Sequence, residues 1–201
     1  MTIIFIIVIL VVFIIYSIFK NSLSNENHGY HNRQQQLADE LFPEEHEQLM
    51  ANLQRGILEA EVLIQADIVG DKKSHDAIVN HTYDGPLPER RDDGGFLSLY
   101  DKLRIIKIAG INHRRNINAY CGRVECALVP EPENEYDPGA IKIVAEDRHH
   151  LGYIPSDMTD FVRSMACEIF PYRCVAFINE IEDEIDGHKF YVGHVYIKKR
   201  E

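Results

Sequence analysis

A short polar stretch in the second half of the chain carries the side chains best suited to binding chemistry. It reads Asn-Glu-Tyr-Asp-Pro-Gly at residues 134–139 and lies between two short apolar runs. Proline fixes φ, glycine permits positive φ and aspartate bonds backbone amides ahead of it, so the stretch predicts a turn between two strands. Small polar residues would suffice for a turn alone. The ring of Tyr136 beside the carboxylate of Asp137 therefore marks the tip as a candidate binding site.

The charge of the chain limits the classes of ligand. Its 201 residues include 21 Lys and Arg against 32 Asp and Glu, a net charge of −11 at pH 7. That balance argues against a protein that binds nucleic acid as a polyelectrolyte. The negative charge is unevenly distributed along the chain. Residues 20–101 hold 7 basic and 16 acidic residues, whereas residues 102–201 hold 14 basic and 16 acidic residues. Basic clusters in the second part, such as Arg114, Arg115 and Arg123, could still bind a phosphate backbone locally.

Sequence motifs of the common enzyme classes are missing. The chain has no G-x-x-x-x-G-K-[ST] loop, no G-x-S-x-G elbow and no H-E-x-x-H helix. The acidic run at residues 180–186 lacks the ligand spacing of an EF-hand and suits a solvated turn. We therefore expect no catalytic activity, no cofactor and no metal ion.

Four cysteines, all in the second half, leave three interpretations open. The spacing is C-x4-C for Cys121 and Cys126 and C-x6-C for Cys167 and Cys174. Structural zinc sites favour two to four residues between paired ligands, so the match to zinc is poor. Reduced thiols in the core or at the surface fit best, with disulfides or zinc as the alternatives.

The chain begins with an apolar run. Residues 3–19 are rich in Ile, Val and Phe and carry no charge, a length at the short end of the roughly 17–25 residues that span a bilayer. A cleaved signal peptide would have a basic start and a small-residue cleavage site, and both are missing. The run therefore predicts a single-pass membrane anchor. Lys20 follows it, so the positive-inside rule places the C-terminal domain in the cytoplasm.

These patterns divide the chain into five segments. The predicted division is an anchor at residues 1–20, a polar tether at 21–42, an amphipathic acidic helix at 43–70, a loop-rich linker at 71–100 and a barrel domain at 101–201. The helix has an apolar stripe at helical spacing, formed by Leu49, Leu53, Ile57, Ala60 and Ile64. It could pack on the domain that follows, pair with a second copy or, through residues 44–66, engage a protein partner.

The last hundred residues predict a small β structure. A helix is expected after Ser156, and Asp186-Gly187 indicates a hairpin between the last two strands. Six short strands with one helix predict a small barrel, since closure removes exposed sheet edges. The strand-like runs are residues 103–111, 124–129, 140–145, 150–154, 173–181 and 188–198.

Three runs in this half resemble a known family. Residues 108–111 (Ile-Ala-Gly-Ile), 130–141 (Pro-Glu-Pro-Glu-Asn-Glu-Tyr-Asp-Pro-Gly-Ala-Ile) and 151–155 (Leu-Gly-Tyr-Ile-Pro) look like the corresponding segments of HIRAN domains. The resemblance covers roughly residues 103–199. It implies a mainly β fold, a six-stranded OB-like barrel with one or two helices. It also implies binding, because a characterised member of the family captures the 3′-hydroxyl end of single-stranded DNA.

The resemblance also implies roles for individual residues. Tyr136 would stack on the terminal base and Asp137 would accept a hydrogen bond from the 3′-hydroxyl, while Asn134 would shape the pocket. A carboxylate at that place suits a hydroxyl donor and repels a phosphate. Together with the anchor predicted at residues 3–19, these three residues would make the chain a membrane-anchored module that binds single-stranded DNA ends.

The segment after the first strand departs from the family. HIRAN domains commonly place a tyrosine there that closes over the base, and this chain has Asn112 and His113. By position, Arg114 and Arg115 would hold the preceding phosphates, with His113 beside them. The alternative is a protein-interaction or scaffold module that keeps the barrel without binding DNA, in which the residues of the turn bond only its amides and the tyrosine plugs the barrel mouth.

Overall fold

The computed structural model describes residues 43–182 and 187–200. The predicted anchor and tether, residues 1–42, lie outside this part of the chain. In the part that is described, no helix has the length and apolar character needed to cross a membrane. The chain divides into two compact units, residues 1–56 and 57–201. The sheet and the candidate site both belong to the second unit.

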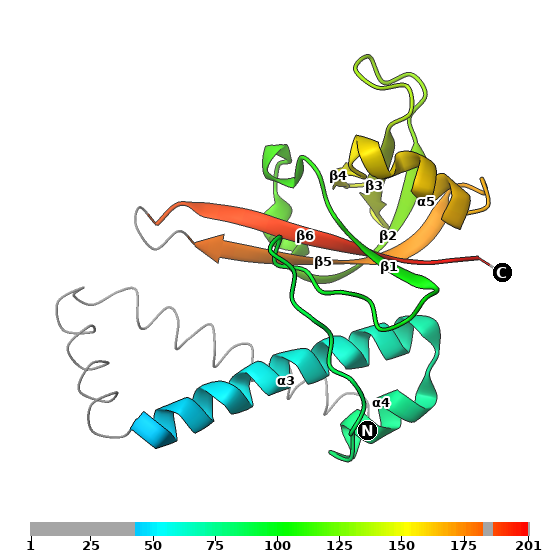
Figure 1. Ribbon diagram of the computed structural model, residues 1–201. Helices are drawn as coiled ribbons and strands as arrows, with labels where there is room; N and C mark the ends of the chain where they lie inside the picture. Colours follow the sequence, from blue (N-terminus) through cyan, green and yellow to red (C-terminus); the bar gives the residue numbers. More distant parts are fainter. Residues whose placement is uncertain (1–42, 183–186, 201) are drawn as a thin grey trace. The chain divides into compact units, whose positions relative to one another are not determined.

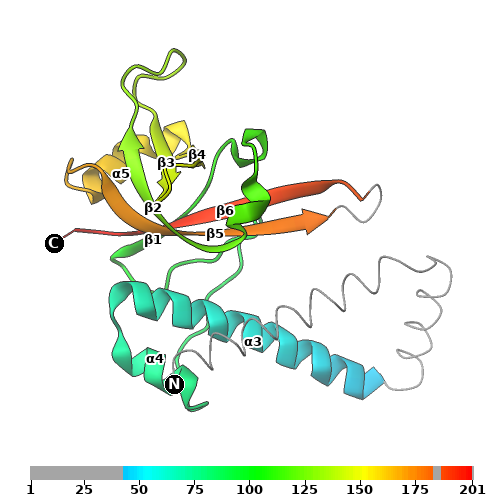
Figure 2. The same ribbon diagram turned by 180° about the vertical axis from the view of Figure 1, so that it is seen from behind.

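The described residues contain one curled sheet of six antiparallel strands, in the order β1-β6-β5-β2-β3-β4 (Figures 1 and 2). The number of strands agrees with the sequence prediction. Strictly alternating burial along β3 shows one face in the core and one outside. The bounds are β1 (Leu103–Lys107), β2 (Gly122–Pro130), β3 (Ile141–Ala145), β4 (His150–Tyr153), β5 (Tyr172–Glu182) and β6 (Lys189–Lys198).

The sheet closes on itself through a single bridge. Ala109, just after β1, donates its N–H to the carbonyl of Tyr153 in β4 (2.8 Å) and accepts the return bond (2.9 Å). Gly152 permits this approach, because a Cβ there would lie 2.6 Å from the Ala109 oxygen and 2.5 Å from Cγ2 of Ile108. The predicted barrel is therefore a curled sheet whose edge strands meet at one point, without a continuous ladder between them.

Aliphatic residues from all six strands form the main core. The helix α5 (Thr159–Met165) follows a 3-10 turn, η3 (Ser156–Met158), and adds buried side chains to this core. All four cysteines are free thiols. Cys126 and Cys174 are buried opposite each other on β2 and β5, with sulfur atoms 3.5 Å apart. The largest fully buried side chains of the core are Ile117, Leu128, Ile141, Ile143, Leu151, Ile178 and Ile197.

The helix α3 (Pro43–Val69) buries a different face from the predicted stripe. Three residues of the predicted stripe, Leu49, Leu53 and Ile57, are 56%, 44% and 52% exposed, so this part of the stripe is not buried against other described residues. The residues buried in the last turns share a different face, which includes two polar side chains. They are Glu61, Val62, Leu63, Gln65 and Ala66.

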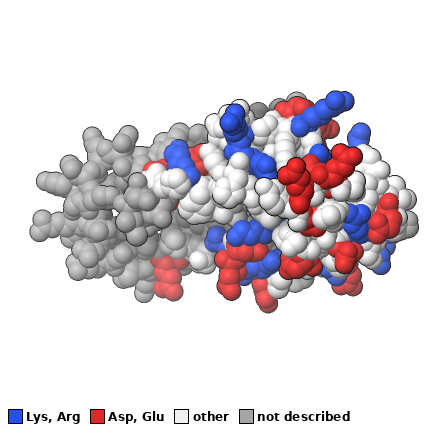
Figure 3. Space-filling view, turned by 90° about the horizontal axis from the view of Figure 1, so that it is seen from above, with Lys and Arg blue, Asp and Glu red and all other residues white. Residues whose placement is uncertain are grey.

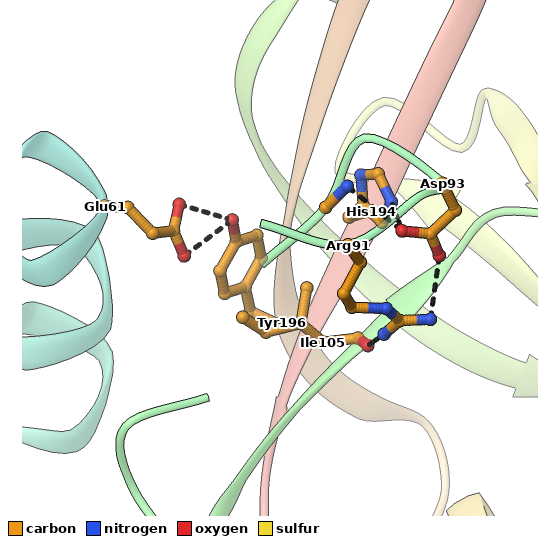
Figure 4. Close-up of polar contacts among 7 residues, drawn as sticks. Glu61, Arg91, Asp93, Ile105, His194 and Tyr196 are labelled. Atoms are coloured by element: carbon orange, nitrogen blue, oxygen red, sulfur yellow. Dashed lines mark hydrogen bonds and ion pairs between the residues drawn. The ribbon is translucent and has the colours of Figure 1, made fainter. Parts of the chain in front are cut away.

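Both buried polar side chains have partners elsewhere in the second unit. The hydroxyl of Tyr196 on β6 contacts the two carboxylate oxygens of Glu61 at 3.1 and 3.0 Å (Figure 4). Gln65 donates to the carbonyl of Leu97 (3.2 Å) and accepts from the N–H of Leu99 (2.8 Å). Such bonds compensate the burial of polar groups. They also hold the segment before β1, which contains a further helix, α4 (Lys72–Val79).

Glu61 predicts a pH dependence of stability. Burial raises the pKa of its carboxyl to about 7, against the hydrogen bonds from Gln65 and Tyr196. Because the unfolded chain ionises this group near pH 4.5, its contribution to the free energy of unfolding falls as the pH rises from about 4.5 to about 7, by roughly 3 kcal/mol. Glu61→Gln should therefore gain stability relative to the wild type across that window, measured by urea unfolding at several pH values.

The exposed carboxylate of Glu89 provides the control. Glu89→Gln, measured in the same way, shows what the loss of a solvent-exposed carboxylate does at each pH. A difference for Glu61→Gln that does not change with pH would contradict the assignment of a raised pKa to that buried group.

Candidate functional site

The connection between β2 and β3 projects from the sheet (Figure 1). Tyr136 belongs to this connection. The tyrosine side chain is 95% exposed. The side-chain oxygen of Asn134 accepts hydrogen bonds from the backbone N–H groups of Tyr136 (3.0 Å) and Asp137 (3.1 Å). This is the way in which asparagine stabilises a tight turn. Asn134 therefore fixes the loop, and the ring of Tyr136 does not plug the barrel mouth.

Asp137 uses one carboxylate oxygen for the turn and leaves the other open. Its Oδ1 accepts a hydrogen bond from the N–H of Gly139 (2.8 Å). Its Oδ2 makes no hydrogen bond to any described residue, and the side chain is half-buried. The sequence left two roles open for this carboxylate, bonding the amides of the turn and accepting a hydrogen bond from a ligand, and the structure is compatible with both. The aspartate serves the turn, and it also presents a free acceptor beside an exposed ring.

A carboxylate under the loop braces its base. Glu131 accepts hydrogen bonds at Oε2 from Asn134 (2.8 Å) and from the hydroxyl of Tyr153 (2.8 Å), and at Oε1 from Lys142 (3.2 Å). The bonds from Asn134 and Tyr153 are the main reason that the pKa of Glu131 falls to about 2. It stays ionised at neutral pH. The sequence alone did not identify this hydrogen-bonded bracket, although Glu131, Asn134 and Tyr153 stand in the motifs quoted above and Lys142 directly follows one of them.

Arg114 is the predicted basic residue that the fold brings to this base. Its guanidinium lies over the ring of Tyr153, 5.1 Å from the ring centroid. Its Nε is buried and has no hydrogen-bond partner within the described residues. After burial itself, the nearby positive charge of Arg114 is the main cause of the lowered pKa of His150. Arg115 is exposed, and Arg123 is paired with Glu125 instead (2.9 Å).

A groove of about 380 Å³ is lined in part by His113, the residue before Arg114 in the chain. Asn112 seals the edge of β6 there, because its side chain donates to the carbonyl of Tyr191 (2.9 Å) and accepts from its N–H (2.6 Å). No acidic side chain lines the groove, although the chain carries a net charge of −11. The lining is Lys107, Ile108, Ala109, Gly110, Ile111, Asn112, His113, Pro155, Phe190, Tyr191 and Val192.

Charges of both signs surround these features. In the view of Figure 3, acidic and basic side chains are interspersed over the described surface, and no broad basic patch covers that face. Glu133 and Glu135 are exposed on the loop next to Tyr136. Within residues 43–182 and 187–200, no group of three or more His, Cys, Asp or Glu could hold a metal ion. The loop with Tyr136 and Asp137 therefore suits stacking and hydrogen bonding, and the positive charge of Arg114 lies at its base.

This half of the chain is similar to known proteins. The HIRAN domain family model matches residues 105–188. This segment is a HIRAN domain. The crystal structure of the HIRAN domain of human HLTF is similar at 14% sequence identity, over 48% of this chain and 77% of that one, with a TM-score of 0.31. Among curated proteins, none matches the chain significantly.

The HIRAN domain includes most of the strands and every predicted site residue. Asn134, Tyr136 and Asp137 stand on one loop, and Arg114 reaches the base of that loop through Tyr153. His113 belongs to the groove, one residue away from Arg114. The structure therefore places Arg114 at the base of the loop that carries Asn134, Tyr136 and Asp137. His113 lines the groove, and Arg115 is exposed.

Proposed function

We propose that the chain is a non-catalytic module that binds the 3′-hydroxyl end of single-stranded DNA. The observation that carries the proposal is a 95% exposed tyrosine, Tyr136, followed by Asp137, whose Oδ2 accepts no hydrogen bond from the described residues. The HIRAN domain supports this function as the one implied by the family resemblance. The apolar run at residues 3–19 supports attachment to a membrane, with the domain in the cytoplasm.

The physical chemistry of the tip favours an end over a continuous strand. An aromatic face can stack on any base, a contact worth about 1–3 kcal/mol. The free oxygen of Asp137 accepts a hydrogen bond from a hydroxyl and repels a phosphate at the same place. Glu133 and Glu135 add negative charge around Tyr136. A terminal 3′-hydroxyl is the part of a DNA strand that meets these conditions.

The groove provides room for the adjoining part of the strand. Its wall includes His113, and the next residue in the chain, Arg114, lies over the ring of Tyr153 at the base of the loop. Its volume of about 380 Å³ lies at the low end of the roughly 300–1,000 Å³ of ligand sites. Lys107 is exposed in it and no carboxylate lines it. These properties suit one nucleotide and its phosphate.

The experiment compares two oligonucleotides that differ only at the 3′ end. Fluorescence anisotropy with the chain in detergent should show tighter binding to a 3′-hydroxyl than to a 3′-phosphate. Asp137→Ala should reduce that preference toward equality, because the carboxylate that rejects the phosphate is gone. Equal binding to both ends, unchanged by the substitution, would contradict capture of a 3′ end.

One observation favours a second function, contact with a protein partner. The first turns of α3 expose Leu49, Met50 and Leu53, three large apolar side chains on a helix rich in carboxylates. An exposed apolar stripe on an acidic helix suits a protein with basic and apolar residues. Under this alternative, the barrel serves as a scaffold, and the two oligonucleotides bind equally and weakly.

A further inference from the structure

Residues 90–96 form a short strap on the sheet. A bridge between Arg90 and Phe96 closes it, and inside that bridge Arg91 donates its N–H to the carbonyl of Gly95 (2.8 Å). The strap lies against His194 of β6, since a Cβ on Gly95 would come 2.7 Å from Nε2 of the imidazole. The absence of a side chain at Gly95 therefore allows the strap to cover the histidine.

His194 is enclosed there among charged groups (Figure 4). Its side chain is only 6% exposed, and Nε2 lies 3.6 Å from Oδ1 of Asp93. Asp93 is already engaged, because its Oδ2 pairs with Arg91 (2.8 Å) and its Oδ1 accepts from the N–H of Gly95 (3.1 Å). Nε2 of His194 has no hydrogen-bond partner within the described residues. The ring thus lies in a closed space whose one carboxylate is shared.

The charges facing His194 come from two elements. The strap contributes Arg91 and Asp93, and Arg91 also binds the carbonyl of Ile105 (2.9 Å). The strand β1 contributes Lys107, which is directly opposite His194 in the register. On the other side, the residue of β5 opposite His194 is the uncharged Phe177. Two cations and one carboxylate therefore face the imidazole.

We propose that His194 is a pH-sensitive latch, whose protonation loosens the strap from β6. A charged imidazole at this site would be buried beside Arg91 and Lys107, and Asp93 could neutralise it only by weakening its pair with Arg91. Burial is the main cause of the lowered pKa of His194, and Asp93 acts against it.

Because the pKa of His194 is lowered while the strap covers it, a lower pH should favour the open strap. A loosened strap exposes the ring, which then ionises near its ordinary pKa of about 6.5. The free energy that holds the strap down is therefore complete above pH 6.5 and decreases as the pH falls below it.

The latch adjoins the groove. A Cβ on Gly94, at the turn of the strap, would lie 3.9 Å from Cγ1 of Val192, and Val192 and Lys107 both line the groove. Loosening the strap would uncover this wall. The latch itself does not depend on what the groove binds.

Hydrogen exchange of the full chain in detergent tests the latch at pH 7.5 and pH 5.5. The reporters are the amides of Arg91, Gly95 and Leu97, which are bonded within or beside the strap. After correction for the intrinsic pH dependence of exchange, the opening constant should rise on acidification, by up to about tenfold for each pH unit below 6.5. His194→Gln should remove the rise. His150→Gln, a half-buried histidine on β4, should retain it.

An NMR titration of the ring provides a second measurement that needs no substitution. His194 should titrate below its ordinary pKa, in step with the exchange of the strap amides. Two results would overturn the proposal: equal corrected protection at both pH values, or an acid-induced rise that persists in His194→Gln.

Discussion

Replacing Tyr136 by alanine should weaken the binding of a 3′-hydroxyl oligonucleotide by about 1–3 kcal/mol, or roughly 5- to 150-fold in Kd. The ring is 95% exposed, so it contributes little to the folded state and is free to stack on a base. Asp137 is the next residue in the chain, so the sugar of a base stacked on the ring would lie near its carboxylate. Fluorescence anisotropy measures this loss of affinity, with a short strand that is labelled at its 5′ end and has a free 3′-hydroxyl.

Two comparisons separate stacking from other effects of the substitution. Tyr136→Phe keeps the ring and should bind within about twofold of the wild type, since the hydroxyl has no role in stacking. Urea unfolding should give the same midpoint for both variants and the wild type, because the side chain is on the surface. Unchanged affinity in Tyr136→Ala would remove the main support for capture of a DNA end at this loop.

The sequence predicted the tip of the site better than its base. Tyr136 and Asp137 could be placed at an exposed turn because Pro138 fixes the local φ and Gly139 tolerates turn conformations. Glu131 could not be assigned in this way, since its partners come from two other strands. Those partners, Lys142 and Tyr153, face each other in the β3–β4 register and point to the same side. Only the pairing of strands brings them under the loop.

The helix α3 shows the same limit at the level of the fold. A count of apolar residues selected the stripe that contains Leu53 and Ile57, and the structure leaves both exposed. The buried face contains Glu61 and Gln65, which are not part of that stripe. Their burial depends on partners far along the chain, such as the hydroxyl of Tyr196, 135 residues from Glu61. Periodicity contains no information about such partners.

The prediction of a barrel depended on strand number, and its closure depends on one glycine. Gly152→Ala should lower the free energy of unfolding by about 2–5 kcal/mol, which combines backbone strain with a clash. The strain arises because φ at Gly152 is +152°. The clash arises because the new Cβ would lie 2.6 Å from the backbone oxygen of Ala109, and a backbone atom cannot move aside as a flexible side chain can.

Gly122→Ala is the matched control for this substitution. Its φ is also positive, +95°, but a Cβ there meets nothing within 4 Å, so it should show the cost of strain alone. The difference between the two variants in urea unfolding then measures the clash at the bridge. Equal losses of stability would show that the approach of Ala109 to β4 is not tight in solution.

The same bridge connects stability with the site. Ala109 bonds the backbone of Tyr153, whose hydroxyl helps to hold Glu131 and, through it, Asn134. A Gly152→Ala chain that still folds should therefore also lose preference for a 3′-hydroxyl, because the bracket that positions Asp137 is displaced. Gly122→Ala should retain that preference. If Gly152→Ala kept the full preference while losing stability, the loop would hold its shape without the bridge, and the turn formed by Asn134 alone would position the carboxylate.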